Sequence, residues 1–161
     1  YLAKTEINGE NYIGGERRSG WINDGSAWYY LDPTTGIMQT GWKQIGNKWY
    51  YLRSSGAMTT GWYQEGSTWY YLDAENGDMK TGWQYLGNKW YYLRSSGAMA
   101  TGWVKDGSTW YYLNASNGDM KTGWTKVNGN WYYLNSNGAM VTGSQTIDGK
   151  VYNFASSGEW I

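Results

Sequence analysis

Aromatic and polar residues follow one another in a single pattern that repeats along most of the chain. Each copy begins with Gly-Trp, and a second Trp seven residues later opens a Trp-Tyr-Tyr triplet. In the copy at Trp42, two aromatic runs flank Gly46-Asn47, a pair typical of a two-residue hairpin turn because Gly and Asn tolerate positive φ. Pairing across this turn sets Trp42 opposite Tyr51 and Gln44 opposite Trp49. Because side chains alternate along a strand, both Trp and the second Tyr share one face, and the first Tyr lies on the other.

The spacing of six full copies indicates that the true period is a pair of hairpins. Their first Trp residues are separated by 21, 20, 21, 20 and 21 residues: Trp21, Trp42, Trp62, Trp83, Trp103 and Trp124. The loop after each hairpin is alternately longer, as at residues 73–77, and shorter, as at residues 53–56. Periods near 20 residues are typical of solenoids, in which small units stack on their neighbours. The sequence predicts an all-β repeat solenoid of stacked hairpins, with two kinds of interhairpin contact alternating in a 41-residue repeat.

Both ends of the chain depart from this pattern. We expect residues 1–20 to form a degenerate hairpin with its turn at Asn8-Gly9, and residues 21–143 to form six full repeats. Residues 144–161 are expected to form a degenerate capping hairpin, since terminal repeats of solenoids are commonly altered.

The last copy loses some aromatic residues and keeps others. Ser144 and Val151 replace its two Trp residues, whereas Tyr152 retains the first Tyr. Phe154 and Trp160 make this hairpin the place where we would look for self-association.

Composition places the apolar surface of the chain mainly in aromatic rings. The 161 residues include 13 Trp and 17 Tyr, whereas Leu, Ile and Val are few. Burial is therefore expected to come from rings in edge-to-face or offset contact. Lys and Arg total 13 and Asp and Glu total 13, so the net charge is zero. Nucleic-acid binding needs a local excess of basic residues, and we expect no nucleic-acid partner.

The sequence lacks the residue types on which many catalytic and metal sites depend. It has no Cys and no His, so it offers neither thiolate nor imidazole chemistry. Asp24, Glu65 and Asp106 recur at one position of alternate copies, which favours a solvated edge over a catalytic pair. We predict no enzyme activity, no metal and no cofactor. No apolar run reaches the length of a membrane span, so we expect no membrane insertion, and we interpret the chain as a fragment or processed module.

A regular array of paired indoles suggests an array of equivalent binding sites. Stacked hairpins would hold the two Trp of one hairpin and the first Tyr of the next around one groove. Tyr152 persists where the last Trp pair is lost, as expected for a groove wall, although a structural role for this Tyr fits equally well. Each full hairpin is followed by Gly-x-Met, and this Met either fills a gap between hairpins or forms one wall of the groove. The six residues are Met38, Met58, Met79, Met99, Met120 and Met140.

An uncharged groove with two or three aromatic walls suits a compact cation such as a quaternary ammonium group. Each ring contributes roughly 0.5–2 kcal/mol, so three rings imply a dissociation constant of about 1 mM. Several such grooves on one chain favour a polymer that carries many cations. Sugars also stack on Trp and Tyr, so a glucan- or glycan-binding repeat is the alternative, and a spacer without ligand is a third.

One stretch carries the repeat in full, Gly82-Trp83-Gln84-Tyr85-Leu86-Gly87-Asn88-Lys89-Trp90-Tyr91-Tyr92-Leu93 with its loop Arg94-Ser95-Ser96-Gly97-Ala98-Met99. It resembles the choline-binding repeat of pneumococcal and phage surface proteins, and the resemblance covers roughly residues 20–143. The resemblance implies a left-handed superhelix of hairpins that binds choline or phosphocholine on teichoic and lipoteichoic acids. It also implies a secreted module, held non-covalently on the cell wall of a Gram-positive bacterium, whose relatives are often attached to cell-wall hydrolases.

The resemblance further implies cages built from two Trp of one repeat, a Tyr of the next and often a Met. The six choline-binding sets are Trp21, Trp28 and Tyr50; Trp42, Trp49 and Tyr70; Trp62, Trp69 and Tyr91; Trp83, Trp90 and Tyr111; Trp103, Trp110 and Tyr132; and Trp124, Trp131 and Tyr152. The partner hairpin of the sixth set is degenerate. These residues do not identify a host-protein partner.

Overall fold

The computed structural model describes residues 4–7, 10–13 and 16–161, with side chains from residue 18 on. Its internal contacts divide the chain into two compact units, Tyr1–Lys80 and Thr81–Ile161. Strands, turns and bends account for the secondary structure of the described residues, which contain no helix. A helix with the length and apolarity of a membrane span is therefore also absent from this part of the chain.

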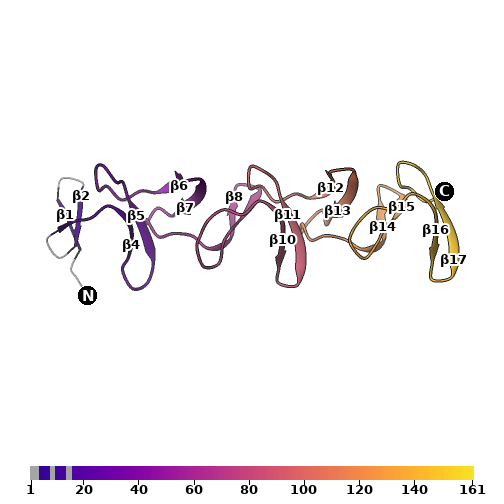
Figure 1. Cartoon of the computed structure of the whole chain (residues 1–161), viewed down its shortest axis with the longest axis horizontal. Helices are drawn as coiled ribbons and strands as arrows, with labels where there is room; N and C mark the ends of the chain where they lie inside the picture. The colour runs from indigo at the N-terminus through magenta and orange to yellow at the C-terminus, as the bar shows by residue number, and fades with distance from the viewer. Residues whose placement is uncertain (1–3, 8–9, 14–15) are drawn as a thin grey trace. The chain divides into compact units, whose positions relative to one another are not determined.

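The first unit is the indigo-to-magenta part of the ribbon in Figure 1, and its described residues contain nine strands. They are β1 (Lys4–Ile7), β2 (Glu10–Ile13), β3 (Glu16–Arg17), β4 (Gly20–Asn23), β5 (Trp28–Leu31), β6 (Gly41–Ile45), β7 (Lys48–Leu52), β8 (Gly61–Glu65) and β9 (Thr68–Leu72). β1, β2 and β3 form one sheet in that order, and the turn expected at Asn8-Gly9 lies outside the described residues. The other strands form three antiparallel hairpins, β4–β5, β6–β7 and β8–β9.

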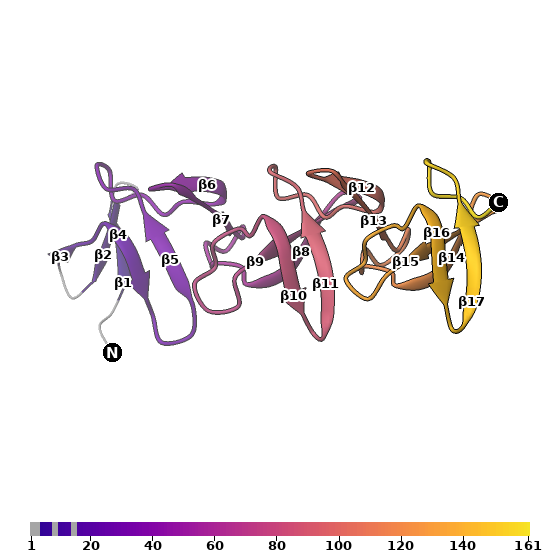
Figure 2. The same ribbon diagram turned by 45° about the vertical axis from the view of Figure 1, so that its right-hand side comes forward.

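The second unit contains four hairpins and no other strands. They pair β10 (Gly82–Leu86) with β11 (Lys89–Leu93), β12 (Gly102–Asp106) with β13 (Thr109–Leu113), β14 (Gly123–Val127) with β15 (Asn130–Leu134), and β16 (Gly143–Ile147) with β17 (Lys150–Phe154). Each hairpin is a separate two-stranded sheet, and consecutive hairpins differ in orientation, as β10–β11 and β12–β13 do in Figure 2.

The observed pairing confirms the predicted hairpin register. In β6–β7, Trp42 pairs with Tyr51 and Gln44 pairs with Trp49. At the turn of β14–β15, Asn128 and Gly129 both have positive φ, 49° and 87°, which matches the twist of a two-residue hairpin turn. The predicted all-β series of hairpins, about 20 residues each, is confirmed.

The most deeply buried side chain of each full repeat is the Leu that ends its second strand. Leu31 is 1% exposed, and the next five are fully buried: Leu52, Leu72, Leu93, Leu113 and Leu134. Each of them pairs in a β-bridge with the Met of the following loop, as Leu52 does with Met58. The expectation that rings supply the burial is therefore correct only in part. The loop folds back across the end of its hairpin, and the narrow space left there is filled by a compact aliphatic side chain.

One backbone hydrogen bond joins consecutive hairpins and recurs within both units. The Met58 N–H donates to the Trp28 carbonyl at 2.8 Å. Equivalent bonds of 2.7–2.8 Å run from Met79 to Trp49, from Met120 to Trp90 and from Met140 to Trp110. Each loop is thereby hydrogen-bonded to the hairpin before its own, at the carbonyl of that hairpin's second Trp.

Candidate functional site: aromatic grooves between hairpins

The first Trp of a hairpin lies between two Tyr rings. Trp21 meets Tyr30 of its own hairpin at 5.1 Å between ring centroids and Tyr50 of the next hairpin at 4.9 Å, both edge to face. The second kind of contact recurs at 4.8–5.0 Å in Trp42–Tyr70, Trp83–Tyr111, Trp103–Tyr132 and Trp124–Tyr152. The structure therefore brings together the first Trp and the predicted Tyr in five of the six sets. In each of these five sets the Tyr packs against the first Trp of the preceding hairpin, and its role as a groove wall stays a prediction.

The remaining set draws on both units of the chain. Trp62 and Trp69 belong to the first unit and Tyr91 to the second. Its assembly stays a prediction.

The second Trp of a hairpin is the exposed ring of each set. The exposed fraction of these side chains runs from 36% to 44%: Trp28, Trp49, Trp69, Trp90, Trp110 and Trp131. Where the two indoles of one hairpin approach each other they are nearly perpendicular, as Trp103 and Trp110 are at 6.4 Å and 89°. An indole left this exposed at the same point of every repeat contributes less to burial and is available to a ligand.

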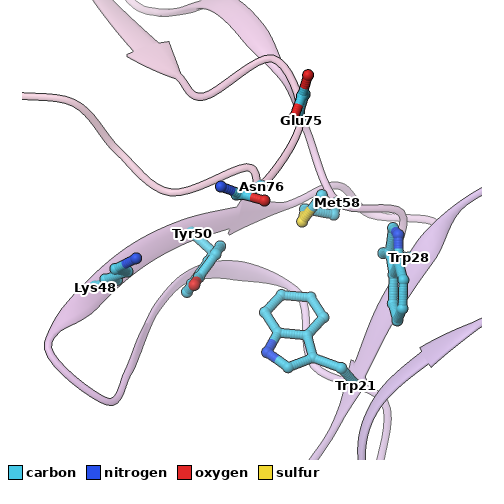
Figure 3. A pocket seen from close by; sticks show the side chains of 7 residues that line it. All are labelled: Trp21, Trp28, Lys48, Tyr50, Met58, Glu75 and Asn76. Carbon is cyan, nitrogen blue, oxygen red and sulfur yellow. The ribbon is translucent and has the colours of Figure 1, made fainter.

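A pocket of about 510 Å³ in the first unit, called the Trp28 groove below, joins these rings. Its seven lining residues are Trp21, Trp28, Lys48, Tyr50, Met58, Glu75 and Asn76. Figure 3 shows Trp21, Trp28, Tyr50 and Met58 around one space, with Lys48 on the side of Tyr50 and Glu75 on the side of Met58. Met58 thus lines the groove in addition to bridging Leu52.

A second pocket, called the Trp90 groove below, has the same design in the second unit. It measures about 350 Å³ and is lined by Trp83, Trp90, Tyr111, Met120, Ser136 and Asn137. Each groove combines three consecutive repeats, because the loop one repeat further along supplies part of the rim. We did not predict this contribution from the sequence, since stacking of neighbouring pairs gives no reason to look beyond the next hairpin. Asn76 and Asn137 each directly precede the Gly of Gly-x-Met, which was the available signal.

Charged side chains lie close to rings of several sets. Burial raises the pKa of the Tyr50 hydroxyl, and the nearby Asp78 carboxylate adds to the rise. The Asp78 side chain is itself buried. Two exposed indoles already attract cations of the chain: Lys105 Nζ lies 5.8 Å from the Trp110 ring centroid, and Lys126 Nζ lies 5.9 Å from that of Trp131.

The recurring acids accept structural hydrogen bonds, within one repeat at Asp24 and between consecutive repeats at Asp106. Asp24 accepts hydrogen bonds from the Ser26 and Ala27 backbone N–H groups at 2.9 Å and so closes its turn. Asp106 accepts a 3.0 Å bond from the Trp83 indole N–H and holds a ring of the Trp90 groove. Nowhere in the described residues do three or more Asp or Glu side chains gather in a way that suits a metal ion.

A further ring, that of Trp160, lies beside the sixth set. Trp160 occupies the Met position of the last repeat, and its backbone N–H donates to the Trp131 carbonyl at 2.8 Å. Its ring lies 5.9 Å from both Trp124 and Tyr152. The match of Gly158-Glu159-Trp160 to Gly-x-Met was the sequence signal for this placement.

Comparison with known proteins identifies the repeat. Residues 39–81, 80–122 and 121–161 match a choline-binding repeat, and residues 19–38 match a cell wall binding repeat. The comparison with curated proteins gives no match.

Three solved pneumococcal structures illustrate the similarity. CbpJ from Streptococcus pneumoniae is 78% identical, with a TM-score of 0.88; the match covers 100% of this chain and 54% of that one. CbpF in complex with ipratropium is 53% identical, with a TM-score of 0.86 and coverage of 100% and 55%. The modular autolysin LytC from Streptococcus pneumoniae is 36% identical, with a TM-score of 0.68 and coverage of 92% and 34%. The chain thus spans about half the length of the first two, and it belongs to the choline-binding repeat family.

Proposed function

We propose that the chain is a non-catalytic anchoring module that binds phosphocholine groups of teichoic and lipoteichoic acids. The observation that carries this proposal is the Trp28 groove, in which Trp21, Trp28 and Tyr50 surround an open space beside Met58. A quaternary ammonium group has no N–H to donate, so its recognition depends on ring faces and dispersion. The grooves supply this kind of wall, and their repetition suits a polymer that carries many choline groups.

Similar proteins support both the proposed class of ligand and the proposed location at the cell wall. CbpF was solved in complex with ipratropium, whose quaternary nitrogen belongs to the same class of cation. Similarity to pneumococcal choline-binding proteins and to a modular autolysin supports an exported module held non-covalently at the cell wall. Any hydrolase or adhesin function then belongs to other parts of the proteins that carry such repeats.

Glycan binding is the second candidate, and the groove rims favour it in one respect. Asn76 lines one groove and Ser136 and Asn137 line the other. Such side chains offer the hydrogen bonds that a stacked sugar ring requires.

Intrinsic Trp fluorescence titrated with choline chloride tests the proposal. We expect a saturable change with a midpoint of about 1 mM, as three ring contacts imply. Sodium chloride at equal ionic strength should give no saturable change, and Trp28→Ala and Trp90→Ala should each reduce the amplitude. A flat choline titration with a response to cell-wall oligosaccharides would support the glycan alternative. A flat response to both would overturn a ligand-binding role.

A further inference from the structure

The two grooves have the same rings but different rims. In the Trp28 groove, Lys48 and Glu75 stand at the rim with Asn76. In the Trp90 groove, the rim residues are Ser136 and Asn137, and no charged side chain lines the pocket. One groove begins at an odd-numbered hairpin of the six and the other at an even-numbered one.

Lys48 is placed at the groove by strand geometry. It is the first residue of β7 and lies two residues before Tyr50, so both side chains are on the same face of the strand. Figure 3 shows it beside the Tyr50 ring. The same position is Thr109 in β13, which supplies Tyr111 to the Trp90 groove, and Thr109 does not line that pocket.

The neighbouring charges leave Lys48 without an ion pair among the described residues. The Asp78 carboxylate is engaged by Lys80, whose Nζ lies 3.4 Å from an Asp78 oxygen and 3.5 Å from an Asp73 oxygen. The residues 41 positions further along the chain pair differently. Asn114 replaces Asp73 there. Asp119, the counterpart of Asp78, lies 4.0 Å from the Nζ of Lys89, the counterpart of Lys48. The extra carboxylate of Asp73 helps to hold Lys80 against Asp78, so Lys48 is available to a ligand.

We propose that the Trp28 groove recognises phosphocholine as a zwitterion, with its rings around the quaternary ammonium and the Lys48 ammonium on the phosphate. This inference rests on the proposed choline-binding function and adds a preference within it. In phosphocholine the phosphate follows the ammonium by two carbons, so a cage that holds the ammonium leaves the phosphate at its rim. The Trp28 groove is also the larger of the two, at about 510 Å³ against 350 Å³. The Trp90 groove binds choline without this preference.

The consequence is a site-specific difference between two ligands. Glycerophosphocholine carries choline on a phosphodiester with one negative charge, whereas choline chloride supplies the ammonium alone. An ion pair near the surface contributes modestly, so we expect glycerophosphocholine to half-saturate the Trp28 groove at about two- to fivefold lower concentration than choline. The two ligands should half-saturate the Trp90 groove at similar concentrations.

¹⁹F NMR of the whole chain labelled with 5-fluorotryptophan resolves the grooves separately. Spectra of Trp28→Phe and Trp90→Phe assign one reporter in each groove, and both ligands are then titrated at matched ionic strength. Lys48→Thr, which installs the residue of β9 and β13, should remove the preference of the Trp28 reporter, and Lys48→Arg should retain it. Thr109→Lys should create the preference at the Trp90 reporter.

The outcomes separate this inference from the proposed function. If choline shifts neither reporter, choline binding itself fails. If choline shifts both reporters but glycerophosphocholine shows no advantage at Trp28, or keeps its advantage in Lys48→Thr, the role of Lys48 is overturned. Inorganic phosphate alone should leave both reporters in place, since the rings and not Lys48 provide most of the binding.

Discussion

The two indoles of a hairpin differ in what they do for the folded chain. Trp21 packs edge to face against Tyr30 and Tyr50, whereas the Trp28 side chain is 44% exposed. We predict that Trp28→Ala removes the choline response of its groove at a cost in unfolding free energy of about 1 kcal/mol. Trp21→Ala should remove the same response and cost about 3 kcal/mol, because two ring contacts are lost.

Urea denaturation and a choline titration of each variant measure the two effects separately. Val151→Ala is the control, since Val151 is 65% exposed and occupies the position of a lost Trp. It should leave stability within about 0.5 kcal/mol of the parent chain. Equal losses of stability for Trp21→Ala and Trp28→Ala would show that the exposed indole is as structural as the packed one.

At the scale of elements, the loops of consecutive repeats interlock. Gly77 has φ +77°, and a Cβ added there would overlap the Met58 Sδ. We predict that Gly77→Ala lowers the free energy of unfolding by about 3 kcal/mol, because of the strain of a left-handed backbone and because of overpacking.

Gly66→Ala is the matched control, because Gly66 has φ +62° but no atom within 4 Å of its added Cβ. It should lower the free energy of unfolding by about 1–2 kcal/mol. In a double-mutant cycle, Met58→Ala should reduce the extra cost of Gly77→Ala, and equal costs at the two glycines would contradict the interlock.

Contacts within a hairpin were easier to predict from the sequence than contacts between hairpins. The register of β6–β7 was predictable, since a two-residue turn and the alternation of a strand determine it. The contact of Trp21 with Tyr50 needed in addition the assumption that consecutive hairpins stack on one another. The rim residues Glu75 and Asn76 were not predicted, because their position depends on how a loop returns over a hairpin two repeats away. Burial of Leu52 was not predicted for a different reason, because one Leu per repeat gives no periodic apolar face to detect.

At the scale of the whole molecule, each groove joins parts of three repeats, so binding and folding are linked. A ligand that binds only the folded chain adds RT ln(1 + [L]/Kd) per site, about 2.7 kcal/mol at a hundredfold excess over Kd. The free energy of unfolding should therefore rise with ln[choline] with a slope that approaches RT for every groove in the cooperative unit. Trp28→Ala should lower that slope by about 0.6 kcal/mol, which is RT for one site. Sodium chloride at equal ionic strength should not raise the free energy of unfolding in this way. Denaturation curves across a choline series measure the slope directly, and an unchanged slope in Trp28→Ala would mean that its groove does not bind choline.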